Sequence, residues 1–220
     1  MLKKALYSLV AAAMLATPAA AEMEFSIYGG TQSAPHSTWT GNVAGIGPVS
    51  KRFGWEGKSF VAPIYYGARA TWWKTDTVGW GLEFTHAKAY APDAEMAPQF
   101  SRLELSDGHN IITINANRRW PGRWANGKLT PYVSGGIGVA VPHVDILPTV
   151  AGAPRTHEFQ FSGPAVKAGA GVKYDINHRW AAFAEYQFTY TDNEVDVNGG
   201  GTLSGTLITN AVNFGVSLKF

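Results

Sequence analysis

The sequence contains no cysteine, which excludes disulfide frameworks, thiolate metal sites, iron–sulfur clusters and thiol nucleophiles. Charged residues make up only 15% of the chain. No apolar run is long enough to cross a bilayer as a helix, so a polytopic helical membrane protein is also excluded. The chain is instead rich in aromatic residues, at 13%, and in glycine, with 25 residues. Together with a mean hydropathy of -0.08, this composition is typical of a membrane β-barrel.

The N-terminus has the residue order of a secretory signal peptide. Lys3 and Lys4 precede an apolar stretch, and a run of small residues follows that ends at Ala21. This order predicts a signal peptide over residues 1–21, cleaved after Ala21, and a mature barrel domain over residues 22–220. A membrane anchor is the alternative, but the apolar part is too short to span.

The charge of the predicted mature chain is balanced. Removing the two lysines of the signal peptide from 18 basic residues leaves 16, against 16 acidic residues. No run of basic residues occurs elsewhere. We therefore expect no nucleic-acid partner.

The mature chain alternates in polarity with a period of two. In one such segment, one face carries Val78, Trp80, Leu82 and Phe84, and the other carries Gly79, Gly81, Glu83 and Thr85. Such alternation predicts strands, and it fits a soluble sandwich as well as a barrel with lipid outside and a polar lumen. The signal peptide, the aromatic residues near strand ends and the terminal Phe220 favour the barrel.

Eight segments have this pattern, at residues 24–34, 60–74, 78–90, 107–119, 129–145, 159–174, 179–191 and 206–220. They predict an all-β protein, an eight-stranded antiparallel up-and-down transmembrane β-barrel. We expect a monomer in the outer membrane of a Gram-negative bacterium.

The predicted connections alternate between short and long. The short ones are residues 75–77, 121–128 and 175–178, and the long ones are residues 37–59, 91–106, 146–158 and 192–205. Because barrels of this kind have short periplasmic turns and long external loops, we expect the short connections on the periplasmic side.

Two segments of the second half, TPYVSGGIGV at 130–139 and AGAGVKY at 168–174, resemble the small OmpA-like outer-membrane barrels. Four further segments resemble barrels described as lipid A oxidases: QSAPHS at 32–37, WEGKSF at 55–60, YYGARATWW at 65–73 and RRWPGR at 118–123. This second resemblance implies oxygen-dependent oxidation of the proximal glucosamine of lipid A to 2-aminogluconate, with a divalent cation. It nominates no site residue.

Charged and amide side chains lie on the inward parity of the predicted strands: Arg69, Glu83, Asn115, Arg119, Lys167, Glu185, Gln187, Asn213 and Lys219. Eight strands leave a lumen just wide enough for side chains, so we expect these groups to pair and fill it. Glu83 and Glu185 could alternatively act as an acid and base pair.

The outer ends of the strands offer the candidate site. His86, Lys88, Asn110, His143 and Asp145 share the lipid-facing parity there. We predict that His86 and His143 are catalytic, that Lys88 and Asn110 bind substrate, and that His86, His143 and Asp145 bind a divalent transition metal. Histidine is also an ordinary residue at a membrane interface, and no close histidine pair specifies a metal site.

The long first loop adds two candidates, Glu56 as a general base or ligand and Lys58 as a partner for lipid A phosphates. The predicted function is a lipid A oxidase that acts on lipopolysaccharide, without nucleotide, flavin or haem. The alternative is a non-catalytic OmpA-like barrel that supports the envelope or binds a surface partner. A passive small-solute channel is disfavoured by the filled lumen.

Overall fold

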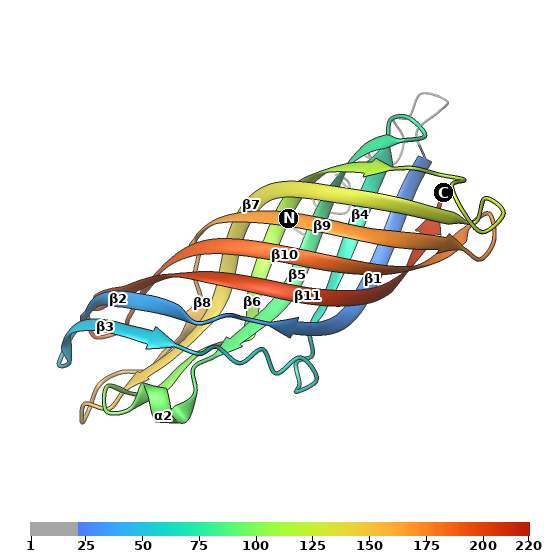
Figure 1. The fold of residues 1–220 in the computed structure, drawn as a ribbon. Helices are drawn as coiled ribbons and strands as arrows, with labels where there is room; N and C mark the ends of the chain where they lie inside the picture. The colour runs from blue at the N-terminus through green and yellow to red at the C-terminus, as the bar shows by residue number, and fades with distance from the viewer. Residues whose placement is uncertain (1–21) are drawn as a thin grey trace, which may run out of the picture.

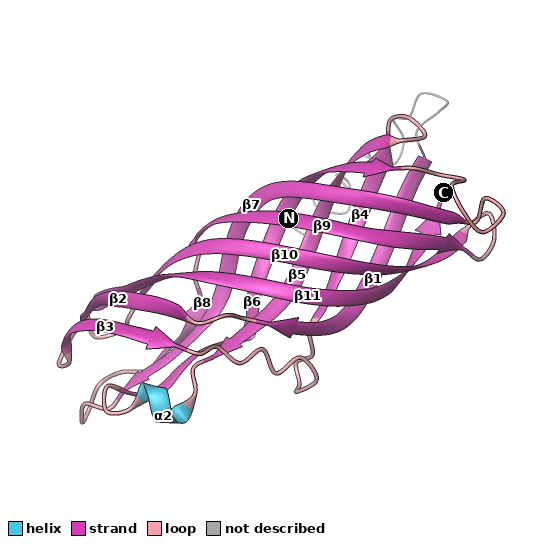
Figure 2. Cartoon of the chain, in the orientation of Figure 1, coloured by secondary structure: helices cyan, strands magenta, loops and turns pink. Residues whose placement is uncertain are grey.

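The computed structural model describes residues 22–220. The predicted signal peptide lies outside these residues. The described chain is almost entirely β-structure with one four-residue helix, α2 (Figure 2). Its elements are β1 (Glu22–Ser33), β2 (Ser37–Val43), β3 (Gly47–Phe53), β4 (Tyr66–Trp73), β5 (Val78–Tyr90), α2 (Asp93–Met96), β6 (Phe100–Arg119), β7 (Leu129–Pro148), β8 (Thr156–Phe159), β9 (Gly163–Asp175), β10 (Trp180–Asp196) and β11 (Gly201–Lys219). No helix among residues 22–220 is both long and apolar enough to cross a bilayer.

The strands form a closed antiparallel barrel. Around the ring, β1, β4, β5, β6, β7, β9, β10 and β11 pair in that order, and β1 pairs with β11 to close it (Figure 1). The predicted fold class is therefore confirmed, and the eight predicted strands correspond to this ring. The count for the described residues is higher, because the sheet contains eleven strands. The three additional strands lie outside the ring: β2 and β3 pair as a hairpin beside β11, and β8 pairs with β7.

Several predicted boundaries are wrong at one end of the barrel. The predicted loop at 37–59 contains β2 and β3, and residues 60–65 precede β4 rather than belong to it. β6, β7, β10 and β11 all extend into predicted loops, and β8 and β9 divide the predicted strand at 159–174. The physical reason is that hydrogen-bonded pairing continues beyond the part of the barrel that has a membrane-type polarity pattern.

We call the end that carries the short turns and both ends of the described chain the proximal end. Arg119 there pairs with Glu22, and Lys219 pairs with Asp175. The opposite, distal end carries β2, β3, β8 and α2 (Figure 1).

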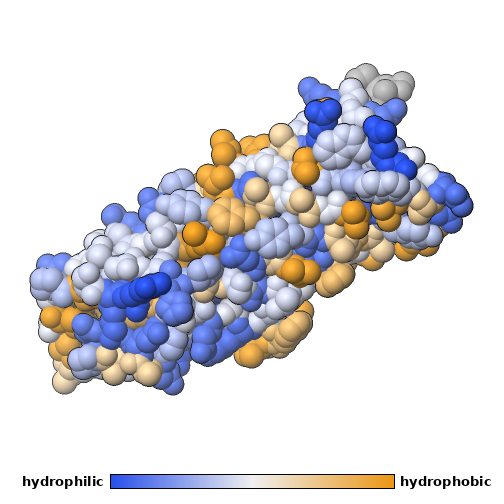
Figure 3. All heavy atoms as spheres, viewed as in Figure 1, coloured by the Kyte–Doolittle hydropathy of each residue, from blue (hydrophilic) through white to orange (hydrophobic). Residues whose placement is uncertain are grey.

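The middle of the barrel exposes apolar side chains, which we call the apolar belt. It includes Ile27, Trp80, Leu82, Ile112, Ile114, Ile137, Val166, Phe214 and Val216. On the face shown in Figure 3, hydrophobic residues gather over the middle of the barrel and hydrophilic residues gather toward its ends. An outward apolar face around a polar interior is the arrangement of a barrel surrounded by lipid.

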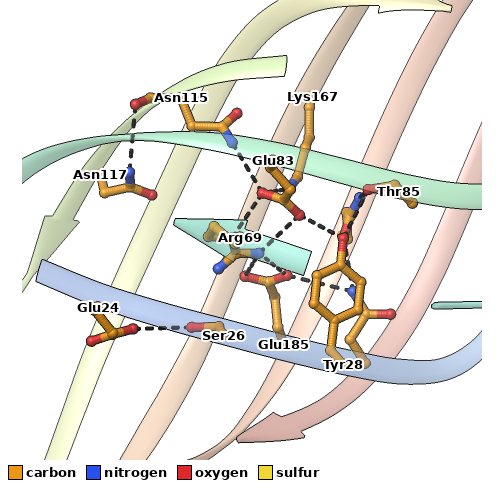
Figure 4. A network of polar contacts seen from close by, with 12 residues as sticks. Glu24, Ser26, Tyr28, Arg69, Glu83, Thr85, Asn115, Asn117, Lys167 and Glu185 are labelled. Atoms are coloured by element: carbon orange, nitrogen blue, oxygen red, sulfur yellow. Dashed lines mark hydrogen bonds and ion pairs between the residues drawn. The ribbon is translucent and has the colours of Figure 1, made fainter. Parts of the chain in front are cut away.

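A charged network fills the middle of the lumen (Figure 4). Arg69 donates to Glu83 Oε2 at 2.7 Å and to Glu185 Oε1 at 2.8 Å, and Lys167 pairs with Glu83 as well. Tyr28 Oη donates to Glu83 Oε1 at 2.6 Å. All of these side chains are buried, which confirms the predicted inward parity and the predicted pairing.

The interior becomes apolar toward the distal end. A buried cluster there, which we call the distal core, includes Trp39, Phe53, Trp55, Leu103, Leu105, Val144, Ile146, Val195, Leu203 and Leu207. The same alternate residues of each strand face inward along its whole length. At the distal end these inward residues are apolar, whereas at the level of the belt many of them are polar. The distal end is thus packed like a soluble β-protein, with polar side chains turned outward.

Candidate functional site

The outward side of β6, β7 and β8 carries a group of polar side chains at the distal end. We call it the distal rim cluster, and it comprises Arg102, Glu104, Asp107, His143, Asp145, Arg155 and His157. It lies beyond Val139 and Val141 of β7, whose side chains share its outward parity. His143 and Asp145 have the predicted outward parity, because Val144 and Ile146 of the same strand face the interior. Both side chains are nevertheless buried where β8 and Arg155 pack beside them, so they are not exposed to lipid as predicted.

β8 brings distant residues against β7. In the register of this pair, His143 lies opposite Phe159, and Asp145 lies opposite His157. Side chains on the same face at diagonal positions of paired strands are within reach of each other. The rings of His143 and His157 accordingly meet edge to face, with their centroids 4.5 Å apart.

A bulge in β6 brings in the third residue. Between the pairs Glu104–Asp145 and His109–Pro142, β6 has more residues than β7, so the ladder shifts. Bulges of this kind change the direction of side chains. Gly108 within the bulge has φ of +116, and a Cβ there would lie 2.4 Å from Asn110 Oδ1, so only glycine fits.

Asp107, His143 and His157 form a compact group. Their nearest ligand atoms all lie within 4.8 Å of one another. Asp107 Oδ2 is 3.5 Å from Nδ1 of His143. His143 is only 7% exposed, and its Nδ1 makes no hydrogen bond to any of the described residues. Asp107 and His157 are about half exposed, so the group opens to the surroundings on one side.

Asp145 forms ion pairs with two arginine side chains. Arg155 donates from Nε to Oδ1 at 2.6 Å and from Nη2 to Oδ2 at 2.5 Å, and Arg102 lies 3.2 Å from Oδ2. Burial acts to raise the pKa of Asp145, but the hydrogen bonds and charges of Arg155, together with Arg102, hold it below its usual value. Burial raises the pKa of Glu104 in spite of its contact with Arg102.

His86 and Asn110 form a separate pair beside this cluster. His86 Nδ1 lies 2.9 Å from Asn110 Oδ1, and its ring stacks on Tyr66 at 5.0 Å. The structure therefore brings together His86 and Asn110, as their shared parity predicts. Of the three predicted metal ligands, only His143 belongs to the compact group with Asp107 and His157.

The remaining predicted residues lie around Tyr90. Lys88 is covered by the segment after β3 and donates from Nζ to the carbonyl oxygen of Val61 at 2.5 Å. Glu56 and Lys58 pair at 3.1 Å, and Nζ of Lys58 lies 4.5 Å from the centre of the Tyr90 ring. Lys58 thus reaches the surface, whereas Lys88 is engaged by the backbone.

A small cavity of about 110 Å³ lies between this group and the distal rim cluster. Its lining includes Lys58, Tyr90, Ser101 and Arg102. It connects the predicted phosphate-binding lysine with an arginine of the rim. Asp93 and Glu104 also line it, so its charge is mixed.

Sequence reasoning did not find Asp107, Arg155 or His157 as site residues. The sequence predicts a long loop at residues 146–158, which contains Arg155 and His157, and a strand that begins at Asp107. No local sequence signal marks His157, because its place beside Asp145 comes from the pairing of residues 156–159 with β7.

The closed antiparallel ring, its outward apolar belt and its polar lumen define a transmembrane β-barrel. No family model matches the chain, and no curated protein matches it. Among solved structures, the chain is similar to Neisserial surface protein A at a TM-score of 0.47 and 14% identity, covering 90% of this chain and 97% of that one. The N-terminal barrel of Pseudomonas aeruginosa OprF has a TM-score of 0.40 and 15% identity, covering 89% and 97%. Ail of Yersinia pestis has a TM-score of 0.38 and 10% identity, covering 88% and 99%.

Proposed function

We propose that this protein is an outer-membrane enzyme that modifies lipid A, with the distal end facing outward and the distal rim cluster acting on the sugar headgroup. The observation that carries the proposal is the outward direction of His143, Asp107 and His157 at the margin of the apolar belt. A buried lumen filled by ion pairs offers no equivalent access for a lipid. Enzyme groups for a membrane lipid must face the leaflet that holds it.

The surroundings of His143 suit an amphiphilic substrate. Phe159, which is 59% exposed, lies with its ring centre 4.8 Å from that of His143, and Phe161 is 68% exposed. Exposed aromatic rings are compatible with acyl chains, while Arg102 and Lys58 line the neighbouring cavity and can donate to phosphate. Apolar and cationic side chains are thus both available in this part of the distal end.

The reaction follows from the resemblance of four segments to lipid A oxidases. The substrate is lipid A whose proximal glucosamine carries no phosphate at C1, so that C1 is a free hemiacetal. This hemiacetal would lose two electrons and two protons to form a lactone. Dioxygen would accept both electrons and both protons to form hydrogen peroxide, and water would then open the lactone to 2-aminogluconate. In this proposal the imidazole of His143, in the distal rim cluster, or that of His86, beside it, accepts the hydroxyl proton.

Mass spectrometry of lipid A tests this proposal. Cells that express the gene should contain lipid A with 2-aminogluconate, and cells without it should not. The double variant His86→Ala, His143→Ala should abolish the product while the barrel still reaches the membrane. His178→Ala, at the proximal end, is the matched control and should retain it. Unmodified lipid A in cells with abundant wild-type protein would contradict the proposal.

The non-catalytic alternative has one observation in its favour. β2 and β3 extend the sheet beside β11. Trp39 of β2, Phe53 of β3 and the nearby Trp55 are buried in the distal core and anchor this hairpin. A rigid surface of this kind can bind a partner without chemistry. It would be favoured if the protein were expressed and folded but left lipid A unchanged.

A further inference from the structure

We propose that Asp107, His143 and His157 bind one divalent first-row transition-metal ion. This ligand set differs from the one that the sequence predicts, because it excludes His86 and Asp145. The proposal rests on the geometry of these three residues and does not depend on lipid A as the substrate.

The first argument is the number and type of ligands. Three side chains from separate elements bring two imidazoles and one carboxylate within 4.8 Å of one another. Two histidines with one carboxylate are a recurrent set for divalent iron, and imidazole also suits zinc, copper and nickel. Calcium and magnesium prefer oxygen ligands, so they fit this group poorly.

The second argument is the unpartnered nitrogen of His143. The residue is more than nine-tenths buried, and its Nδ1 faces Asp107 without making a hydrogen bond to the described residues. Buried polar atoms are nearly always paired, so an atom of this kind needs a specific explanation. An ion held between His143 and Asp107 would supply the missing partner.

The third argument is the environment of His157. Asp145 Oδ2 lies 3.7 Å from Nδ1 of His157. Carboxylates commonly stand behind metal-binding imidazoles, where they fix the orientation of the ring. Arg155 fixes the Asp145 carboxylate through two hydrogen bonds, so this carboxylate can hold the ring of His157 in one orientation.

The fourth argument is charge. The distal rim cluster has three carboxylates, on Glu104, Asp107 and Asp145, against the two guanidinium groups of Arg102 and Arg155. Asp145 accepts from both arginines, and Glu104 pairs with Arg102. Asp107 is therefore the carboxylate left without an arginine, and it is the one that contacts His143. The local balance favours a cation at this position.

The ion would have room for further ligands. Asp107 and His157 are about half exposed, so water or an oxygen atom of a bound molecule can reach the group from outside. Three protein ligands with open positions are typical of metal sites that take part in chemistry, whereas structural sites are closed by four.

Direct binding measurements test the proposal. The full-length barrel, folded in detergent micelles and freed of metal with a chelator, is titrated with Co²⁺ while its visible absorption is recorded, and Zn²⁺ is then added as a competitor. We expect one Co²⁺ per chain, displaced by Zn²⁺. His157→Ala and Asp107→Asn should each lower the affinity about 100-fold or more. Both residues are exposed, so these variants should fold even if replacing the buried His143 hinders folding.

Two comparisons make the result specific. His178→Ala removes a histidine at the proximal end and should bind Co²⁺ like the wild type. Failure of the folded wild type to bind, or wild-type affinity in both His157→Ala and Asp107→Asn, would overturn the proposal. Metal binding is measured on the purified protein without lipid A, and lipid A modification is measured in cells. A failure of metal binding and a failure of lipid A modification can therefore be told apart.

Discussion

Arg69 and Glu83 lie directly opposite each other on β4 and β5, and Nε of Arg69 donates to Oε2 of Glu83 at 2.7 Å. Arg69 also reaches across the lumen to Glu185 on β10, while Lys167 on β9 reaches Glu83 (Figure 4). Two cations and two anions thus neutralise one another inside the barrel. The contacts join strands from opposite sides of the ring.

This network predicts a strong effect of removing one charge. Glu83→Gln leaves Lys167 and part of Arg69 without their anion in a buried site, so it should lower the free energy of unfolding by about 3–5 kcal/mol. Urea unfolding followed by the heat-modifiable migration of the barrel on a gel measures the loss. Asp192→Asn, on an exposed position of β10, is the control and should change stability little. Equal stability of the two variants would contradict a structural role for the network.

A second variant separates charge from packing. In Glu83→Gln, Lys167→Met, one anion and one cation are removed together, so the remaining Arg69 and Glu185 still balance. We expect this double variant to be more stable than Glu83→Gln alone, because the unpaired buried charge is gone. The same gel assay measures it. Lys167→Met alone gives the reference value. If Lys167→Met lowered stability in the Glu83→Gln background as much as it does in the wild type, the two residues would be acting independently.

The membrane-embedded part of the fold could be predicted from the sequence because its polarity alternates along most strands. Outward residues are mostly apolar and inward residues are mostly small or polar, apart from a buried cluster that includes Ile111 and Phe183, so parity assigns Glu83 and Lys167 to the lumen. The bounds of β5 were predicted without error for the same reason. The distal end could not be predicted in this way, since Leu103 and Val144 face inward there and the polarity of the pattern is reversed.

The candidate site was predictable only where it depends on parity. His143 and Asp145 are on β7, two residues apart, and their common outward direction follows from strand geometry. The outward position of Asp107 depends on a bulge, and the contact of His157 depends on a pairing between β7 and β8. Neither feature has a local signature in the sequence, because each arises from hydrogen bonding between separate segments.

The orientation of the barrel is a further prediction. If the distal end faces outward, the turn that contains Asp76 faces the periplasm, whereas Ala94 in α2 is external. Because the native chain has no cysteine, single variants Asp76→Cys and Ala94→Cys can be treated with a membrane-impermeant thiol reagent on intact cells. We expect labelling of Ala94→Cys only. The reverse pattern would invert the topology and place the distal rim cluster in the periplasm.

The bulge in β6 predicts a position where only glycine is tolerated. In Gly108→Ala, the new Cβ would combine an unfavourable φ with a clash at Asn110 and the ring of His86, so we expect a loss of about 1–3 kcal/mol. Gly135→Ala is the matched control, because its Cβ would meet only the carbonyl oxygen of Lys167 at 3.9 Å. Urea unfolding of both variants measures the difference. Equal midpoints would mean that the bulge is not held in this conformation.

The last prediction concerns the depth of the distal rim cluster in the membrane. A site for lipid A must lie within reach of the bilayer surface, and Phe159 is an exposed apolar residue whose ring lies next to His143. A nitroxide attached to Phe159→Cys in proteoliposomes should therefore be relaxed more strongly by dissolved oxygen, which concentrates in lipid, than by a water-soluble nickel complex.

The same label on Asp76→Cys, in an exposed proximal turn, is the control and should show the opposite preference. Apolar side chains at the belt margin favour lipid because moving a Phe-sized surface out of water is worth about 1.5–3 kcal/mol. If the label at Phe159 instead behaved like that at Asp76, the rim would stand clear of the bilayer. The metal site could then still bind its ion, but lipid A would no longer be the substrate that its position favours.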